Sequence, residues 1–407
     1  MDFLDKFSAS SARLRPNVIR EMLKLTHGKS LISFAGGLPS ASSFASREIR
    51  EVISDLLDRS PEPVLQYGLT QGCRELLEPL CGYMDSRGVA GTKPENLLIT
   101  SGAQQALDLL GRLLLDPGDA ILVELPTYIG AITTFRNLGA NLVGVSQDEE
   151  GISLEALDRM LANLKREGKR AAFLYTVPNF SNPSGVLMSP ARRQKLVELA
   201  RKLDFLIVED DAYGELYFSD CPPEAVRPLS AWETEGRIIY VGTFSKTIAP
   251  GIRTGWVRGA PELIARLELV KQGADLFTST LNQRIAAEIM ARGIFQARLP
   301  GLRAAYEKKR DAMIEALAAA MNAPVEWNRP HGGFFVWLRL PPELDATVLM
   351  KPAIDAGVAY IPGQPFRVDD GGSNTIRLAF STESEATIQE GIRKLSRFLQ
   401  KASRGDL

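Results

Sequence analysis

Short apolar runs alternate with segments of helical periodicity along most of the chain from about residue 96. Runs such as 120–123 (AILV) are continuously apolar, as expected of strands that are covered on both faces. The helical segment over 190–203 opens with Ser189-Pro190, a typical helix start. The strand candidates are 96–100, 120–123, 141–145, 171–177, 204–209, 237–241 and 254–258. This alternation predicts an α/β fold with a mostly parallel sheet between helices.

The pattern changes after a long amphipathic segment at 297–321. Strand candidates at 333–340, 358–361 and 375–380 follow, and they suggest a smaller α+β unit. We therefore expect three parts. They are an N-terminal segment over 1–45 that packs across the other two, a large domain over 46–295 and a small domain over 296–407.

Composition excludes several classes of partner. The chain has 407 residues, of which 24% are charged, and a formal net charge of -1, so nothing favours nucleic acid or an anionic membrane. No run of 18 apolar residues occurs, and the N-terminus lacks the apolar stretch of a signal peptide. We expect a soluble cytoplasmic protein that binds neither nucleic acid nor membrane.

Cysteine and histidine are scarce. Cys73, Cys81 and Cys221 show no paired spacing, which fits a reducing compartment better than a disulfide framework. His27 and His331 are the only histidines and lie far apart in sequence, so we expect no metal site built on them.

The strand exits are where chemistry is expected, because ligands bind beyond the carboxyl ends of strands in open α/β sheets. The first candidate strand ends in Ser101-Gly102, directly before a helix. Free N–H groups and the positive end of the helix dipole suit an anion there, most naturally a phosphate. A plain serine N-cap is the alternative.

The segments that follow the next strands carry an aromatic ring, a side-chain amide and acidic side chains. Tyr128 follows the strand at 120–123, and Asn182 lies in a turn set by Pro183, where turn chemistry alone is the alternative role. Three acids in a row, Glu209-Asp210-Asp211, come before Tyr213. Burying their charged carboxylates costs free energy unless a cation pairs with them. A metal could do so, but the sequence offers no partner cluster.

Lys246 leaves the strand at 237–241 between Thr243, Ser245 and Arg253. Locally it could be a solvated charge or a reactive amine. Taken together, the strand exits suit pyridoxal 5′-phosphate. A lysine forms its Schiff base, a carboxylate keeps its pyridine nitrogen protonated, and hydroxyls with an arginine hold its phosphate.

The chain resembles the fold-type-I pyridoxal-phosphate (PLP) aminotransferases of class I/II over essentially its whole length. Within them it is most similar to the branch of 2-aminoadipate aminotransferase (LysN-type) and kynurenine aminotransferase II. The resemblance implies a large domain with a seven-stranded, mostly parallel sheet. It rests on SFAGGLP (33–39), QYGLTQG (66–72), SGAQQAL (101–107), NPSG (182–185), EDDAYGELYF (209–218), FSKTIAPGIR (244–253) and NTIRLAFS (374–381).

The resemblance implies catalytic roles for four residues. Lys246 matches the Schiff-base lysine that also moves the substrate proton, and Asp210 matches the carboxylate on the pyridine nitrogen. Tyr213 and Asn182 match the donors to the phenolic oxygen of the cofactor, and Tyr128 matches the ring stacked on its pyridine face.

The resemblance also implies a phosphate site and a partner. Tyr67 fits the tyrosine that the other subunit of a homodimer contributes, so the active sites would be shared. The remaining expected cofactor contacts are Ser101, Gly102, Ala103, Gln104, Thr243, Ser245 and Arg253.

Substrate contacts are implied in the same way. Arg377 matches the clamp for the α-carboxylate, a bidentate task, and Asn182 and Gly37 lie beside it in the family. Arg20 falls where the aminoadipate branch places an arginine that faces the distal carboxylate of the substrate. It could equally be a solvated charge on a helix. Candidate substrates are 2-aminoadipate, glutamate, leucine and aromatic amino acids.

We therefore expect a transaminase that passes an amino group to a 2-oxo acid, such as 2-oxoglutarate, by ping-pong kinetics. Another PLP reaction on the same fold, such as β-elimination, decarboxylation or oxidation, remains the first alternative. A PLP-binding sensor module, as in MocR-type transcription regulators, is the second. About 45 residues precede the expected large domain, without the pattern of a winged helix, which favours an enzyme.

Overall fold

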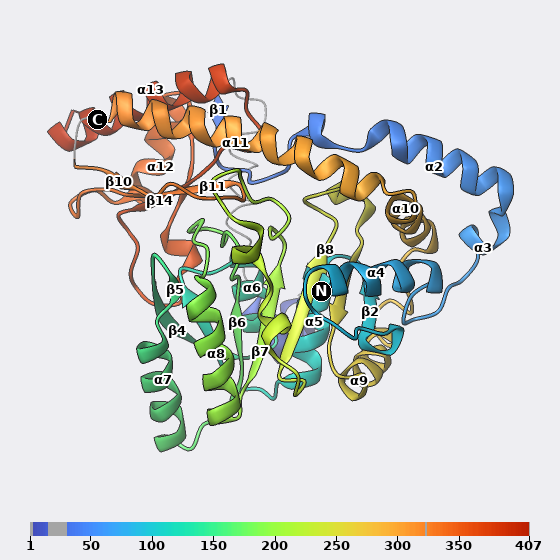
Figure 1. Cartoon of the computed structure of the whole chain (residues 1–407). Helices are drawn as coiled ribbons and strands as arrows, with labels where there is room; N and C mark the ends of the chain where they lie inside the picture. Colours follow the sequence, from blue (N-terminus) through green and yellow to red (C-terminus); the bar gives the residue numbers. More distant parts are fainter. Residues whose placement is uncertain (1–2, 15–30, 322–323, 407) are drawn as a thin grey trace.

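The central feature of the computed structural model, which describes residues 3–14, 31–321 and 324–406, is an eight-stranded sheet (Figure 1). Its strand order is β2-β9-β8-β7-β6-β3-β4-β5. The strands are β2 (Leu97–Thr100), β3 (Ala120–Leu125), β4 (Asn141–Asp148), β5 (Gly151–Ile152), β6 (Ala171–Thr176), β7 (Leu206–Asp211), β8 (Ile238–Thr243) and β9 (Gly255–Arg258).

The sheet confirms the predicted mostly parallel α/β fold. β4, β3, β6, β7 and β8 run parallel, while β9 pairs antiparallel with β8 and β2. The seven expected strands are all present. The eighth is β5, which pairs antiparallel with the end of β4. Two residues are too few for a periodic pattern, so β5 could not be predicted from the sequence.

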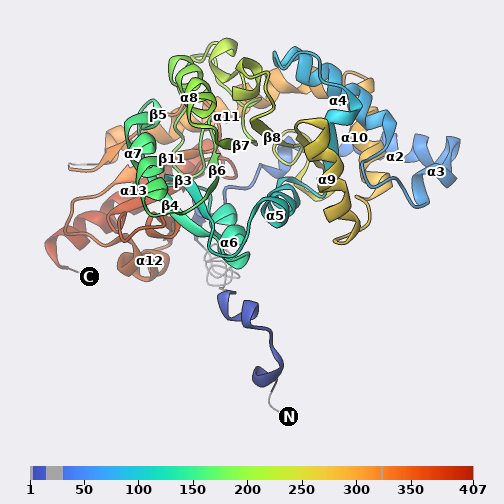
Figure 2. The same ribbon diagram turned by 90° about the horizontal axis from the view of Figure 1, so that it is seen from below.

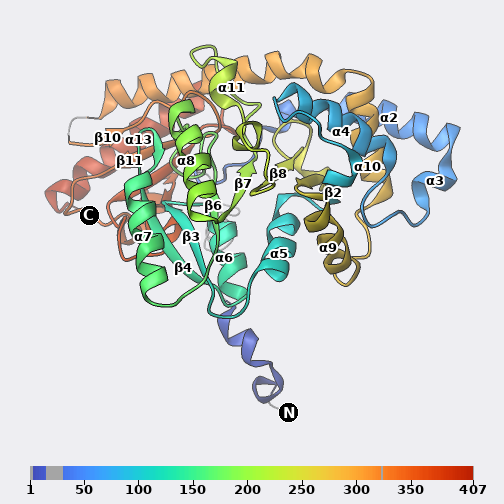
Figure 3. The ribbon, with the colours of Figure 1, turned by 60° about the horizontal axis from the view of Figure 1, so that its bottom comes forward.

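Helices cover both faces of this sheet (Figure 3). On one face, α5 (Ala103–Leu114), α6 (Ile129–Asn137) and α9 (Pro261–Gln272) share a core with Val123, Val208 and Val241. On the other face, α7 (Leu154–Arg166) and α8 (Pro190–Leu203) pack against Leu122, Leu174 and Ile207. Successive strand residues face opposite sides, so continuous apolar runs serve both cores.

A smaller four-stranded antiparallel sheet has the order β10-β11-β14-β13. Two long helices, α11 and α13, lie side by side over this part of the chain (Figure 1). Its elements are β10 (Glu326–Trp327), β11 (Phe335–Arg339), β13 (Ile361–Pro362), β14 (Thr375–Ala379), α11 (Ile294–Ala320), α12 (Ala346–Asp355) and α13 (Glu385–Arg404). On this arrangement we propose the same three-part division, 1–45, 46–295 and 296–407.

The N-terminal part runs in two directions. β1 (Ile32–Ser33) pairs with β12 (Val358–Ala359), and the backbone N–H of Ser40 donates to the Tyr306 hydroxyl of α11 over 3.1 Å. Residues 3–14 instead extend away from the body beside α6, although we expected the whole segment to pack across both domains (Figure 2). The Arg13 guanidinium reaches the body, where it donates to the Asn137 carbonyl over 3.3 Å.

Four of the remaining helices, α2, α3, α4 and α10, pack beyond the β2 edge of the large sheet (Figure 1). No helix in the described part of the chain is long and apolar enough to cross a membrane. These remaining elements are α2 (Ser46–Arg59), α3 (Pro61–Leu65), α4 (Arg74–Ser86), α10 (Thr280–Ala291), η1 (Leu4–Lys6), η2 (Ala9–Arg13), η3 (Ala41–Ser43), η4 (Pro94–Asn96), η5 (Pro223–Val226), η6 (Leu229–Trp232), η7 (Pro250–Ile252) and η8 (Gln364–Phe366).

Candidate active site

A cavity of about 530 Å³ lies at the carboxyl edge of the large sheet, closed on one side by β14 of the small sheet. The loops after β3, β6, β7 and β8 and the start of α5 all contribute to it. The sequence-predicted residues that line it are Gly37, Ala103, Gln104, Tyr128, Asn182, Asp210, Tyr213, Thr243, Ser245, Lys246, Arg253 and Arg377. Residues far apart in sequence thus meet in one place.

Lys246 follows β8 and extends into this cavity. Its Nζ lies 5.7 Å from the centre of the Tyr213 ring and 5.8 Å from that of Phe334. Burial, with help from the positive charge of Arg377, lowers the pKa of the Lys246 amine to about 8. The amine is therefore much more readily neutral than a solvated lysine, as a nucleophile or base requires.

Asp210 reaches the same cavity from the end of β7. Its Oδ2 accepts a hydrogen bond of 2.8 Å from the Tyr175 hydroxyl, whereas its buried Oδ1 has no partner among the described residues. Burial raises the pKa of the Asp210 carboxyl to about 6, although the bond from Tyr175 opposes the rise. A buried carboxylate oxygen without a donor suits a protonated ring nitrogen.

The neighbouring acids point away from Asp210, as alternation along a strand requires. Asp211 pairs with Arg87 at 3.1 Å, and Glu209 accepts from the backbone N–H groups of Leu229 and Ser230. The expected cation is therefore an arginine. No group of three or more His, Cys, Asp or Glu side chains in the described residues could hold a metal ion.

A cradle for an anion forms between α5 and the loop after β8. The guanidinium of Arg253 donates to the Ser101 carbonyl at 3.0 Å and lies 3.4 Å from the Ser245 hydroxyl. Gly102 has φ 82° and ψ 169°, a conformation essentially restricted to glycine, and an added Cβ would lie 2.5 Å from Arg253 Nη2. The positive charge, the hydroxyls and the helix N-terminus suit a phosphate.

Ser101 itself does not line the cavity. Its backbone N–H donates to Gln105 Oε1 over 2.7 Å, and its hydroxyl lies 3.3 Å from Asp275. The buried Lys271 bonds to both Gln105 and Asp275. Sequence patterns missed this support, because it joins α5 to Lys271 at the end of α9 and to Asp275 just after it, far away in the chain.

Arg377 projects from β14 and is 1% exposed. It donates to Asn182 Oδ1 at 2.9 Å and to the Ala35 carbonyl at 2.5 Å, while its buried Nε has no partner among the described residues. Burial lowers the pKa of this guanidinium to about 10. Gly37 lies close by, with φ 62°, and an added Cβ there would lie 2.7 Å from the Phe335 ring. The arrangement suits a small carboxylate.

Two aromatic side chains complete the walls. Burial raises the pKa of both the Tyr128 and Tyr213 hydroxyls, so both remain neutral donors at ordinary pH. A side-chain bond from Asn182 stabilises the Tyr213 oxygen. The Tyr128 hydroxyl lies 3.5 Å from Gln104 Oε1, a weak bond at best.

Besides Ser101, two further predicted residues in the described part of the chain, Gly102 and Tyr67, do not line the cavity. Tyr67 is 76% exposed, and its ring lies 5.5 Å from that of Phe277. Arg20 lies outside the described residues.

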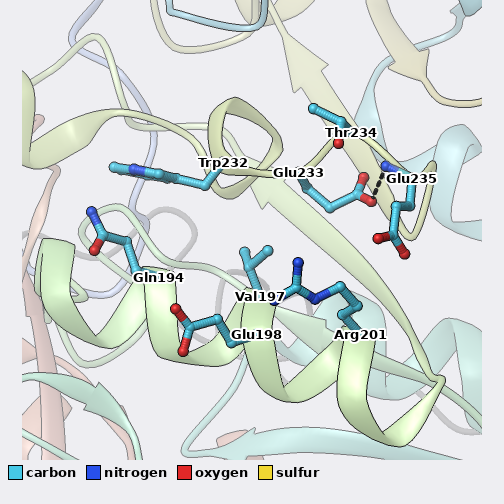
Figure 4. Close-up of a pocket in the computed structure, with 8 residues that line it drawn as sticks. All are labelled: Gln194, Val197, Glu198, Arg201, Trp232, Glu233, Thr234 and Glu235. Carbon is cyan, nitrogen blue, oxygen red and sulfur yellow. Dashed lines mark hydrogen bonds between the residues drawn. The ribbon is translucent and has the colours of Figure 1, made fainter.

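A second hollow, of about 300 Å³, lies beside α8 (Figure 4). Its loop precedes β8, so it is at the amino ends of the strands, away from the cavity above. Glu233 accepts there from the backbone N–H of Glu235 over 2.5 Å. The lining residues are Gln194, Val197, Glu198, Arg201, Trp232, Glu233, Thr234 and Glu235, and none is a predicted site residue.

Comparison with known proteins agrees with this geometry. Residues 32–395 match the family described as aminotransferase class I and II. The chain is 40% identical to aromatic-amino-acid aminotransferase 1 of Thermococcus litoralis, covering 98% of this chain and 95% of that one. It is 39% identical to 2-aminoadipate transaminase of Thermus thermophilus, covering 98% of each.

A solved structure is equally similar. It is a kynurenine aminotransferase of Pyrococcus horikoshii in complex with PMP, kynurenine (KYN) as substrate and KYA as product. The two chains superpose with a TM-score of 0.94 at 40% identity over 98% of each. The predicted fold type and branch are thereby confirmed.

Proposed function

The chain belongs to the class I and II aminotransferases and is a PLP-dependent transaminase, and we propose that the residues gathered at the cavity perform its amino transfer. The observation that carries this assignment is that one cavity holds Lys246 and Asp210, whose buried Oδ1 has no hydrogen-bond partner among the residues that the structure describes. We propose 2-oxoglutarate as the amino acceptor and a ping-pong sequence.

Bound PLP supplies an electron sink for the electron pair left at the substrate Cα when its proton departs. Asp210 provides the negative charge that keeps the pyridine nitrogen protonated. The Lys246 amine takes the proton from the substrate Cα and later gives a proton back, so it acts first as a general base and then as a general acid. A pKa of about 8 keeps a useful fraction of this amine neutral near neutral pH.

The other residues bind and orient. Arg253, Ser245 and Thr243, with the first N–H groups of α5, hold the phosphate. Arg377 binds the substrate α-carboxylate with its free donors, and Asn182, which Arg377 holds, donates with Tyr213 to the phenolic oxygen of the cofactor. Tyr128, whose ring lines the cavity, would pack against the pyridine ring.

We propose that the substrate range is broad. The relatives' names include aromatic amino acids, 2-aminoadipate and kynurenine. Leu38, Ile129 and Val177 give the described part of the cavity apolar walls, which suit leucine and aromatic side chains. Arg20 would add a charge for 2-aminoadipate or glutamate.

We also propose a homodimer whose partner lends Tyr67 to each site. The exposure of Tyr67, Leu65 and Leu69 supports this, because adjacent large apolar side chains in water usually mark an interface. A cytoplasmic location, which three unpaired cysteine thiols would suit, belongs to the same proposal.

The test is a screen of single amino acids with the PLP-loaded enzyme, with and without 2-oxoglutarate. Amino transfer predicts that substrates discharge the visible absorption of the cofactor, and that 2-oxoglutarate restores it with one glutamate per 2-oxo acid. Ammonia, carbon dioxide or hydrogen peroxide as the co-product would instead support a lyase, a decarboxylase or an oxidase.

A further inference from the structure

Tyr175 lies on β6, beside the strand that carries Asp210. Its side chain has no exposed surface, and its hydroxyl donates to Asp210 Oδ2 over 2.8 Å. No sequence motif pointed to this tyrosine, which sits inside the apolar run AAFLYTV. It does not line the cavity, so any effect that it has on bound molecules must act through Asp210.

Few other groups near Asp210 can stabilise its ionised carboxylate. The titratable and charged groups near it are Tyr175 on β6, Asp211 on its own strand, Lys246 after β8, and the cavity tyrosines Tyr128 and Tyr213. Of these, only Tyr175 donates a recorded hydrogen bond to the carboxylate, while Asp211 adds a like charge. Among the described residues, Lys246 is the cation that acts on it, and its positive charge favours ionised Asp210.

We propose that Tyr175 is a positioning residue for the cofactor: it holds the Asp210 carboxylate ionised and with Oδ1 facing the pyridine nitrogen of PLP. This inference rests on the proposed role of Asp210. The geometry supports it, because Tyr175 holds Oδ2, while Oδ1 is buried and has no partner in the described part of the chain. A carboxylate held by one donor has only its second oxygen to offer to a ligand.

The physical reason for such a support is the cost of burial. Even with the Tyr175 bond, burial keeps the pKa of Asp210 at about 6, well above that of a solvated aspartate. Without that donor the pKa rises further, and a neutral carboxyl stabilises a protonated pyridine far less than a carboxylate does. The carboxyl would also be free to rotate.

Tyr240 provides a matched control. It is a buried tyrosine on β8, and its hydroxyl donates to Asp211 Oδ2 over 3.1 Å. Asp211 does not line the cavity, and it is also held by Arg87, Asn179 and the backbone of Gly214. Tyr240→Phe therefore removes the same buried hydroxyl from the neighbouring carboxylate without touching the proposed cofactor contact.

The experiment compares Tyr175→Phe and Tyr240→Phe in the PLP-loaded enzyme. We expect Tyr175→Phe to raise the dissociation constants of PLP and of pyridoxamine phosphate about tenfold or more, and to shift the visible absorption of bound PLP. We expect kcat to fall by a similar factor while KM for the amino acid changes less than threefold. Tyr240→Phe should leave all these values within twofold, even where it lowers the unfolding midpoint as much as Tyr175→Phe does.

A double-mutant cycle excludes a merely structural effect. In an Asp210→Asn background, Tyr175→Phe should change PLP affinity less than twofold. If Tyr175→Phe proves unstable, Tyr175→His, whose ring N–H can donate, should regain part of the affinity. Equal effects of Tyr175→Phe and Tyr240→Phe, or an undiminished effect in Asp210→Asn, would overturn the inference.

These outcomes separate the inference from the proposed function. A wild-type enzyme that transfers amino groups, with Asp210→Asn impaired and Tyr175→Phe unaffected, refutes only the role of Tyr175. Wild-type affinity for PLP in Asp210→Asn refutes the proposed role of Asp210 and the inference with it.

Discussion

The Arg377 guanidinium donates to Asn182 Oδ1 over 2.9 Å, and this bond joins β14 of the small sheet to the loop after β6 of the large sheet. A substrate carboxylate at Arg377 is thereby placed in fixed relation to the groups that surround the cofactor. Positioning of this kind supplies much of the rate advantage of an enzyme. The bond also makes Arg377 the residue whose replacement should most directly weaken substrate binding.

Arg377→Lys should lower kcat/KM for amino acids on the order of 10- to 100-fold. A charge-assisted hydrogen bond contributes about 1.5–3 kcal/mol, and lysine cannot reproduce the paired donors. PLP affinity should change less than threefold. Steady-state kinetics and PLP titration check this, with Arg339→Lys, at an exposed position on β11, as the control. An unchanged kcat/KM would remove Arg377 from the substrate site.

Gly102→Ala should weaken PLP binding about tenfold or more. The backbone there is restricted to glycine, and the added methyl group would collide with Arg253 in the proposed phosphate cradle. Gly118→Ala is the control, because Gly118 also has a positive φ, of 96°, but an added Cβ there meets nothing within 4 Å. Equal PLP affinities in the two variants would show that the collision with Arg253 has no effect of its own, and would contradict the proposed phosphate cradle.

Lys246→Met should make the PLP-free protein more stable than the wild type at pH 7, on the order of 1–3 kcal/mol. Folding lowers the pKa of the Lys246 amine from 10.5 to about 8, so below pH 8 the folded protein bears the full cost of burying a charge. Between pH 8 and 10.5 the unfolded chain binds more protons, so the wild type gains stability and the difference shrinks. Denaturation of both proteins across pH 7–10.5 measures it, and a difference independent of pH would contradict a lowered pKa.

Arg20→Gln should separate acidic from apolar substrates. If Arg20 meets a distal carboxylate, kcat/KM for 2-aminoadipate and glutamate falls about 10-fold or more, whereas that for leucine stays within threefold. Parallel kinetics with the three amino acids decide the question. A uniform change, or none, would identify Arg20 as a charge remote from the substrate.

Tyr67→Ala should weaken PLP binding through the partner subunit. Mixed dimers of Tyr67→Ala and Lys246→Ala contain one site with both native residues, so a fraction of sites with wild-type PLP affinity should reappear on mixing. Light scattering should show twice the chain mass of 44.6 kDa. A monomer, or mixing without recovery, would contradict the shared site.

Much of the fold could be predicted from the sequence, because strands buried on both faces are continuously apolar. β7 and β8 were expected at 204–209 and 237–241 and lie at Leu206–Asp211 and Ile238–Thr243. Their ends extend through polar residues, which local patterns assign to loops. The position of residues 3–14 could not be predicted, because it depends on contacts with residues far away in the chain, such as the bond from Arg13 to the Asn137 carbonyl.

The candidate site was predictable where residues follow a strand or fit a family motif, as Lys246 and Asp210 do. Supporting residues were not. Tyr175 looks like any buried strand tyrosine. The network of Arg193, Asn179 and Asp211 joins α8, the loop after β6, and β7, which no local pattern links. The acidic run did predict a cation, and Arg87 fills that role, but nothing local identified which one.

The most direct test of amino transfer at Lys246 follows the nitrogen itself. The PLP-loaded enzyme is given an amino acid labelled with ¹⁵N, together with unlabelled 2-oxoglutarate, and its products are measured by mass spectrometry. Our account predicts one ¹⁵N-glutamate for each 2-oxo acid formed, and a loss of turnover on the order of 10⁴-fold in Lys246→Ala. Label released as ammonia, or undiminished transfer by Lys246→Ala, would contradict it.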